Sequence, residues 1–303
     1  MIGPHGMSDS PPRYERPKEA LPPPATLDLG TVIPASALDE ALAASGLSEG
    51  GRALARGLIR LGRSAMFGGG GAGIEYGGLL KTATRPDYIG AHVREVADHL
   101  RERQVDLLMV PGMSGYPVGA MYSIVSGVPA VLLKKQRHDG RAPEGGYAPG
   151  AFVIPSYTGD SDVLISADLA SAQDIVDTIL RAQLRAQAGA EALSLTLRVA
   201  GADDIIDKAT MSQAVSESAL IVGKAAIGSF MERYRAETDE RRMVSESVEV
   251  VAWVTPLIKG YNRPQEQLRK WFGITPFAGL NVTSVHLDPP AIGIEGLGVV
   301  AFP

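Results

Sequence analysis

The amino-acid sequence predicts an α/β fold with an open parallel sheet flanked by helices, followed by a C-terminal α+β segment. Between residues 86 and 199, short apolar runs alternate with segments of helical periodicity, which is the order expected of βαβ units. From residue 248 onward, prolines punctuate further apolar runs, so this part is expected to be an appended β-rich piece outside the parallel sheet.

The composition narrows the class of protein. The chain has 303 residues, 45% of them hydrophobic, which suffices for one large domain or one domain with an accessory unit. A net charge of −5 argues against nonspecific nucleic-acid binding, and the lack of cysteine excludes disulfides, thiolate metal sites and a cysteine nucleophile. No apolar run approaches the roughly 20 residues that cross a bilayer, and the N-terminus lacks a signal-peptide pattern. A soluble cytoplasmic protein without a membrane partner is therefore expected.

The first part of the chain holds an arm, helices and a glycine-rich loop. Residues 1–30 are rich in proline with interleaved charges, so this arm is expected to be disordered or extended. Leucines at helical spacing over 36–64 predict one or two amphipathic helices. The glycine run 67–73 predicts a mobile or substrate-covering loop. Phosphate binding there is the weaker alternative, because a P-loop needs a preceding strand and a lysine at a set spacing.

Residues 106–135 carry the clearest pattern of alternating elements, and a helix expected over 86–103 precedes them. The elements are a strand, a loop, a helix, a strand and two lysines, at Leu107–Val110, 111–116, Val118–Val125, Val128–Leu133 and Lys134–Lys135. A parallel sheet builds anion sites in this way, because its strands end together at one edge.

The same alternation continues after a polar, glycine-rich stretch at 136–150. Further parallel strands and helices are expected at 162–166 (strand), 170–187 (helix), 192–199 (strand) and 203–243 (helix). Shorter strands are expected at 248–254, 281–287 and 297–302.

Candidate site residues lie where these strands end. The loop residues Gly112, Met113, Ser114 and Gly115 expose backbone N–H groups that suit an oxyanion, although a tight strand–helix turn would look the same. Lys134 and Lys135 end the next strand, where they could neutralise a phosphate or simply reach water. The polar stretch beyond them is longer than an ordinary connection, and such loops are often lids. Its residues Arg137, His138 and Arg141 could close over an anionic substrate.

In the order of these motifs, the chain resembles the type I phosphoribosyltransferases, most closely the adenine phosphoribosyltransferase-like and phage-encoded members. The resemblance covers roughly residues 50–200. It matches 112–115 to the family's pyrophosphate loop, Lys134–Lys135 to its Arg-Lys pair, and about 136–155 to its mobile loop. It matches 163–175 to the family signature of an apolar strand, two acids and a small-residue loop that opens a helix.

The resemblance implies roles for the residues of this signature. Ala167 stands at the first acid, and Asp168 keeps the second, which would hold the ribose hydroxyls and the metal. The loop that wraps the 5′-phosphate would consist of Ser171, Ala172, Gln173 and Asp174. Asp174 would oppose a phosphate there, because two like unit charges ~4 Å apart repel by about 4 kcal/mol at an effective dielectric near 20. As the plainer alternative, Asp174 only favours the helix dipole.

The resemblance also implies a domain division and a reaction. Residues 31–205 would form the phosphoribosyltransferase-like domain with an N-terminal hood, and 206–303 a helical and β-rich extension. The reaction would move a ribosyl group from phosphoribosyl pyrophosphate, or a related donor, to a nitrogenous base and release pyrophosphate, with Mg²⁺ as cofactor. Asp168, Lys134 and Lys135 would carry catalysis, and the family suggests a homodimer. The alternative is a non-catalytic nucleotide-binding or regulatory protein that kept the fold.

Overall fold

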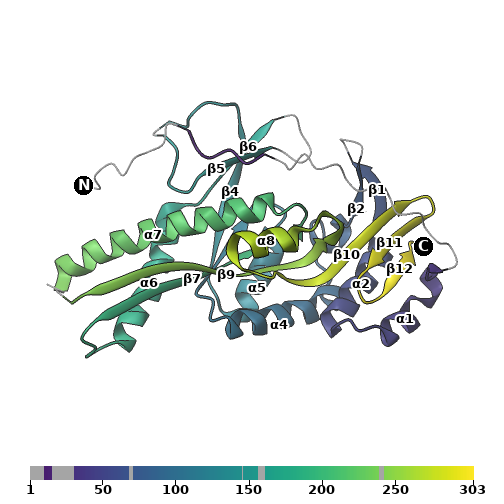
Figure 1. Cartoon of the computed structure of the whole chain (residues 1–303), viewed down its shortest axis with the longest axis horizontal. Helices are drawn as coiled ribbons and strands as arrows, with labels where there is room; N and C mark the ends of the chain where they lie inside the picture. The colour runs from purple at the N-terminus through teal and green to yellow at the C-terminus, as the bar shows by residue number, and fades with distance from the viewer. Residues whose placement is uncertain (1–9, 16–30, 68–70, 145, 156–160, 239–241) are drawn as a thin grey trace.

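A computed structural model describes residues 10–15, 31–67, 71–144, 146–155, 161–238 and 242–303. Five parallel strands form the centre of its main sheet, in the spatial order β4, β3, β7, β9, β10 (Figure 1). Their bounds are β3 Leu107–Pro111, β4 Ala130–His138, β7 Leu193–Ala202, β9 Val244–Lys259 and β10 Phe277–Leu287. The predicted open parallel sheet is confirmed.

Alternate side chains of each central strand pack against opposite layers of helices. Leu107 and Met109 of β3 join a core with α6 (Leu169–Ala186), α7 (Thr210–Thr238) and α8 (Pro264–Phe272). Leu108 and Val110 join a second core on the other face. The helices of that face are α1 Leu38–Ala44, α2 Glu49–Leu61, α3 Gly77–Leu80, α4 Pro86–Glu102 and α5 Tyr116–Ser126. Every residue of β3 is buried, which explains its unbroken apolar sequence.

The strand predicted at 162–166 exists, but the expectation that it belongs to the parallel core was wrong. This strand, β6 (Asp162–Ser166), runs antiparallel to the second half of β4, with Lys134 beside Ser166 and His138 beside Asp162. β4 continues five residues beyond the predicted end at Leu133, and this extension gives β6 a partner. β5 (Phe152–Pro155) pairs antiparallel with β6, so the region predicted to be a lid is a small sheet that stands above the core in Figure 1.

Residues 10–15 of the predicted arm are extended and lie along β5. The Tyr14 N–H donates to the Val153 carbonyl at 2.9 Å, and the Val153 N–H donates to the Pro12 carbonyl at 3.0 Å. Arg13 forms an ion pair with Asp162 at 2.9 Å. The rest of the arm lies outside the described residues. The arm therefore adds backbone contacts to the edge of the lid sheet.

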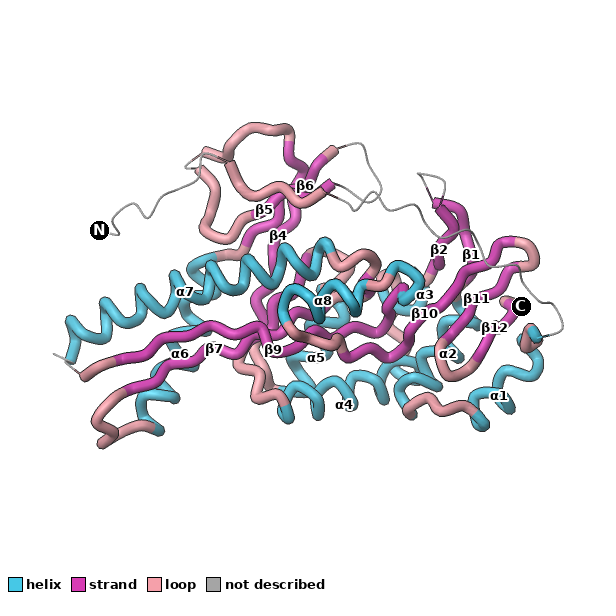
Figure 2. The backbone as a smooth tube through the Cα atoms, in the orientation of Figure 1, coloured by secondary structure: helices cyan, strands magenta, loops and turns pink. Residues whose placement is uncertain are grey.

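The C-terminal part is rich in strands, as predicted, but it does not stand outside the parallel sheet. β9 lies beside β7 over most of its length, as Figure 2 shows, and the two strands are parallel. β10 runs parallel to β9. Only β11 (Pro290–Ile294) and β12 (Gly298–Ala301) extend the sheet in antiparallel fashion.

The glycine-rich segment and helix α7 both differ from what the sequence predicted. Arg63–Phe67 (β1) and Gly71–Glu75 (β2) form an antiparallel hairpin where a loop was expected, and residues 68–70 lie outside the described chain. α7 is the one described helix that is long and apolar enough to cross a membrane by length and composition. Its apolar window is 61% buried, because the helix packs on the sheet.

Candidate functional site

The loop between β3 and α5 is built around two glycines that the structure requires. A Cβ atom on Gly112 would lie 2.5 Å from the Tyr116 hydroxyl and 2.7 Å from the Leu133 carbonyl oxygen. A Cβ atom on Gly115 would lie 2.8 Å from the Pro111 carbonyl oxygen and 2.9 Å from Asp203 Oδ1. Met113, between them, is 71% exposed, so the outer part of the loop faces solvent. The backbone here can approach a ligand closely.

Two consecutive acids, Asp203 and Asp204, follow β7 at the same edge of the sheet. The register pairs Met109 of β3 with Gly201 of β7, so the two strands end side by side. Asp204 is 2% exposed and accepts a hydrogen bond from the Tyr76 hydroxyl at 2.8 Å. Its backbone N–H donates to Asp203 Oδ1 at 2.8 Å. The Asp203 carboxylate therefore lies next to the glycine loop, and the Asp204 carboxylate lies beside Tyr76.

The charges at this edge favour an added cation. Burial and the neighbouring charge of Asp204 raise the pKa of Asp203 well above its usual range. The Lys81 ammonium lies 3.4 Å from Asp204 Oδ2 and also acts on Asp203. Because the raised pKa favours a proton on Asp203, a cation that binds here would replace that proton.

The chain then turns into α7 through a short loop. Ile205–Ile206 (β8) pairs with β9, and α7 begins at Thr210. Asp207, inside this loop, accepts hydrogen bonds from Lys259 Nζ at 2.9 Å and from the Asn262 amide. The first turn of a helix leaves backbone N–H groups without helical partners, so this loop offers donors at the same edge.

The apolar strand, acid pair and helix-opening loop at 193–210 therefore match the family signature better than 163–175 does. The sequence pattern predicted the signature at 163–175 and a helix from residue 203 onward; in the structure, β7 ends at Ala202, the two acids follow it, and α7 begins at Thr210. The signal was present, because two acids follow an apolar run directly. β6 is also followed by an acid and a helix, so its sequence pattern is similar. However, β6 is antiparallel to β4 and is not a neighbour of β3.

Asp168, the acid predicted to bind ribose and metal, is the N-cap of α6. Its carboxylate accepts from the Ser171 N–H at 3.1 Å and forms an ion pair with Lys134 Nζ at 2.8 Å. The hydrogen bond from Lys134, followed by that from Ser171, lowers the pKa of Asp168 to about 2. Asp168 therefore holds a helix end and a lysine, and its carboxylate oxygens already have partners.

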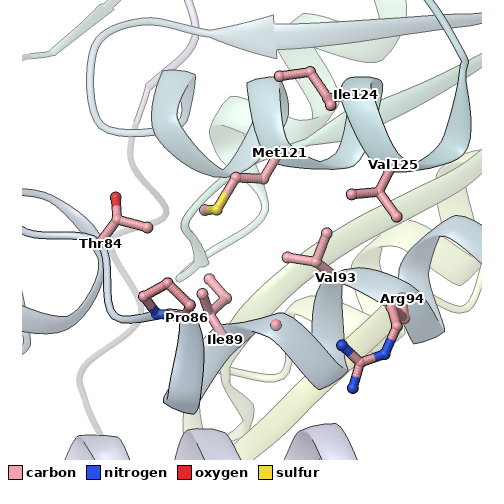
Figure 3. A pocket seen from close by; sticks show the side chains of 9 residues that line it. Thr84, Pro86, Ile89, Val93, Arg94, Met121, Ile124 and Val125 are labelled. Atoms are coloured by element: carbon pink, nitrogen blue, oxygen red, sulfur yellow. The ribbon is translucent and has the colours of Figure 1, made fainter.

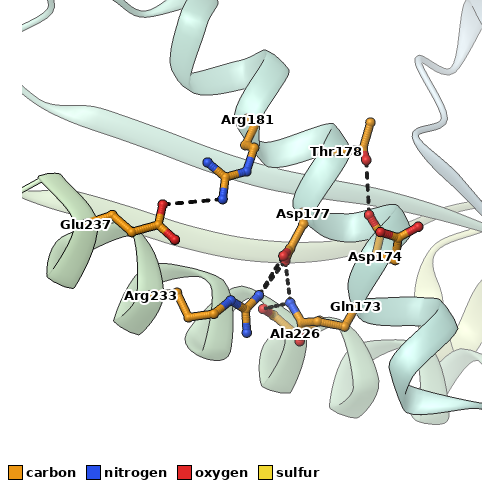
Figure 4. A network of polar contacts seen from close by, with 8 residues as sticks. All are labelled: Gln173, Asp174, Asp177, Thr178, Arg181, Ala226, Arg233 and Glu237. Atoms are coloured by element: carbon orange, nitrogen blue, oxygen red, sulfur yellow. Dashed lines mark hydrogen bonds and ion pairs between the residues drawn. The ribbon is translucent and has the colours of Figure 1, made fainter.

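The residues predicted to form the phosphate loop, Ser171, Ala172, Gln173 and Asp174, lie in the first turns of α6. Gln173 Nε2 donates to Asp177 Oδ1 at 2.6 Å and to the Ala226 carbonyl of α7 at 2.9 Å (Figure 4). Arg233 of α7 donates to both oxygens of Asp177 at 2.7 Å. Ala172 is buried in the core. We conclude that this segment joins α6 to α7, which corrects its assignment to an anion loop.

Lys134 and Lys135 lie just past the point where β4 meets the glycine loop. The Leu133 carbonyl accepts from the Gly112 N–H at 3.1 Å and from the Tyr116 hydroxyl at 2.5 Å. The hydrogen bond to Asp168 raises the pKa of Lys134. Successive side chains of a strand point to opposite faces, so one lysine is expected on each face of β4.

An apolar groove of about 460 Å³ lies elsewhere, between α4 and α5 (Figure 3). Ile89 and Val93 of α4 line it opposite Met121 and Val125 of α5, and Arg94 is the charged side chain of the lining. Binding sites for polar ligands need several convergent polar groups, which this groove does not have. The glycine loop and acid pair remain the candidate site.

The fold and this site define an open α/β protein with a candidate anion-binding and cation-binding edge at the carboxyl ends of β3 and β7. No family model and no curated protein matches the chain. Among solved structures, it is similar to adenine phosphoribosyltransferase from Thermoanaerobacter pseudethanolicus, with 14% identity, a TM-score of 0.41, and coverage of 72% of this chain and 95% of that one.

Two further matches are also adenine phosphoribosyltransferases, the family that the sequence resembles. The enzyme from Giardia lamblia, complexed with 9-deazaadenine, has 13% identity and a TM-score of 0.42, covering 75% of this chain and 96% of that one. The enzyme from Trypanosoma brucei, in complex with AMP, pyrophosphate and ribose-5-phosphate, has 10% identity and a TM-score of 0.36, covering 74% and 79%. At TM-scores below 0.5, this likeness carries no conclusion about activity.

Proposed function

We propose that the protein is a transferase of the phosphoribosyltransferase type. It moves a ribosyl group from phosphoribosyl pyrophosphate, or a related donor, to a nitrogenous base and releases pyrophosphate. One observation carries the proposal, namely that the glycine loop and the acid pair lie together at the ends of adjacent parallel strands, where a Cβ atom on Gly115 would lie 2.9 Å from Asp203 Oδ1. An oxyanion site and a diol or cation site thus share one edge of the sheet.

Different residues of the site would bind different parts of the donor, phosphoribosyl pyrophosphate. The backbone N–H groups of 113–115 would hold the pyrophosphate. Asp203 and Asp204 would accept hydrogen bonds from the two ribose hydroxyls. The loop before α7 would receive the group at the 5′ position, where the helix start supplies N–H donors.

The acid pair also fits a magnesium ion. Among the residues that the structure describes, no cluster of three or more carboxylate or histidine side chains is placed to hold a metal. Mg²⁺ commonly binds through one or two carboxylates together with substrate phosphates, which is what Asp203 and Asp204 beside a pyrophosphate loop could provide. When bound, the ion would neutralise charge on the leaving pyrophosphate.

The chemistry asked of the protein is positioning and charge stabilisation. The bond between the ribose C1 atom and the pyrophosphate oxygen breaks, and a bond from C1 to a nitrogen of the base forms. By the family resemblance, positive charge develops on the ribose in the transition state. The carboxylates on the hydroxyl side and the donors on the pyrophosphate side stabilise the separating charges, because they are fixed before the reaction.

The loop before α7 differs from the threonine and glycine pattern of the family. Asp207, Lys208 and Ala209 stand there, and Ala209 has a positive φ of 60°. Lys259 and Asn262 bind the Asp207 carboxylate, so its charge is compensated. This departure favours a donor with another group at the 5′ position. It also supports the second candidate function, a protein that binds a nucleotide without turning it over.

Calorimetry with phosphoribosyl pyrophosphate and Mg²⁺ tests the proposal. The wild-type protein should bind, and D203N and D204N should each bind at least tenfold more weakly. D174N is the matched control, because Asp174 is exposed on α6 and should leave affinity unchanged. Pyrophosphate release with a panel of nitrogenous bases then separates the transferase from the non-catalytic alternative. Absence of binding by the wild type at millimolar phosphoribosyl pyrophosphate would refute a transferase that uses this donor.

A further inference from the structure

The segment between β2 and α4 brings a tyrosine and a lysine to the acid pair. Lys81 Nζ lies 3.4 Å from Asp204 Oδ2 and 4.6 Å from the centroid of the Tyr76 ring. Tyr76 is 5% exposed and donates its hydroxyl hydrogen to the same Oδ2 atom at 2.8 Å. The resemblance to known enzymes assigned no role to either residue.

The backbone fixes where Lys81 stands. α3 is a single helical turn between Tyr76 and Lys81, and the side chains of its Leu79 and Leu80 are buried. The Lys81 N–H closes the turn on the Gly77 carbonyl at 2.9 Å. The start of the lysine side chain is therefore held by packed structure, while its flexible end remains adjustable.

The two partners of this ion pair differ in exposure. The Asp204 side chain is 2% exposed, but the Lys81 side chain is 40% exposed. An ammonium group has three N–H donors. The Lys81 ammonium contacts Asp204 and the Tyr76 ring, both of which are buried in the protein. The Lys81 charge also acts on Asp203. A Cβ atom on Gly115 would lie 2.9 Å from Asp203 Oδ1, so the partly exposed ammonium lies at the same edge of the sheet as the glycine loop.

We propose that Lys81 is a donor-contacting residue for the pyrophosphate group, which Asp204 keeps in place until the donor binds. This inference rests on the proposed function. Before binding, Lys81 neutralises part of the charge of the acid pair. When the ribose hydroxyls and a cation occupy the acids, its ammonium moves to a pyrophosphate oxygen, as a lysine on a flexible stem can. Lys81 thus links the segment before α4 to the chemistry.

Two probes separate this role from a merely structural one. Magnesium pyrophosphate should bind K81M about tenfold more weakly than the wild type, and K81R should retain most of the affinity because the charge stays. Ribose 5-phosphate should bind K81M within twofold of the wild type, since its hydroxyls meet the acids and not Lys81. D204N should show the opposite split, with the larger loss for ribose 5-phosphate.

Controls and contrary results complete the experiment. K270M removes an exposed lysine of α8 and should change neither affinity. Calorimetric affinities are compared only for variants whose melting temperatures stay near that of the wild type. Unchanged pyrophosphate affinity in K81M, or an equal loss for both probes, would overturn the role of Lys81 and leave the proposed function standing. Failure of the wild-type protein to bind either probe would overturn the proposed function, and this inference with it.

Discussion

The substitution G115A tests the contact between the glycine loop and the acid pair. Gly115 has φ −73° and ψ −21°, which alanine adopts without strain, so the added methyl group acts only through its neighbours. That methyl carbon would lie 2.8 Å from the Pro111 carbonyl oxygen and 2.9 Å from Asp203 Oδ1. The first neighbour is the backbone of β3, so the loop itself must move.

The expected cost follows from overpacking. Inserting a methyl group into a packed site typically costs about 1–3 kcal/mol. With an unfolding entropy of about 2.1 cal/mol/K per residue over 303 residues, this lowers the melting temperature by about 2–5 °C. Affinity for magnesium pyrophosphate should fall at least tenfold, because the loop and the carboxylate no longer fit one ligand.

The assay compares G115A with a glycine that has room. A Cβ atom on Gly228, in α7, meets nothing within 4 Å, so G228A should raise stability by about 0.5–1 kcal/mol and leave affinity unchanged. Calorimetric unfolding and pyrophosphate binding are measured on both variants. If G115A were as stable as the wild type and bound pyrophosphate equally well, the described contact at the site would be refuted.

Three further predictions concern stability. Because the pKa of Asp168 in the folded protein is about 2, its interactions stabilise the fold above pH ~4 and are lost as the pH falls toward 2. In D168N, the free energy of unfolding measured in urea should therefore change less with pH over that range. Burial lowers the pKa of His92 to about 3, so wild-type stability should decrease as the pH falls from ~6.5, and H92Q should remove that slope in the same assay. W253F should cost about 1–3 kcal/mol in urea unfolding, since buried Trp253 donates to Ser216 Oγ at 2.9 Å; an unchanged midpoint would contradict that contact.

The parallel core could be predicted from the sequence because burial on both faces leaves a mark. The run at 107–111 is apolar throughout, and every residue of β3 is buried. Whether a strand runs parallel or antiparallel to its neighbours has no comparable signature in the sequence. β6 is as apolar as its neighbours, and only its pairing with the extension of β4 makes it antiparallel.

The C-terminal strands were misjudged for a related reason. The first half of β9 has exposed charged residues such as Glu246 and Glu249, so its sequence does not resemble that of a strand in a covered sheet. Its second half, from Ala252 to Lys259, is fully buried between the helix layers. One strand thus has two environments, which an average over the sequence hides.

Half of the candidate site could be predicted and half could not. The glycine loop at 112–115 and the lysines after it follow from local pattern, because glycine spacing and strand ends are local properties. The acid pair required knowing which strand lies beside β3, and that is decided by the whole sheet. The chain contains two strand–acid–helix patterns, and only pairing separates Asp168 from Asp203 and Asp204.

A crystal structure of the protein with phosphoribosyl pyrophosphate and Mg²⁺ tests the central claim most directly. We expect the pyrophosphate at residues 112–115 and the ribose hydroxyls on Asp203 and Asp204, with the Asp168–Lys134 ion pair still capping α6. Donor density on Asp168 and residues 171–174, with nothing on Asp203 and Asp204, would contradict the assignment of the site.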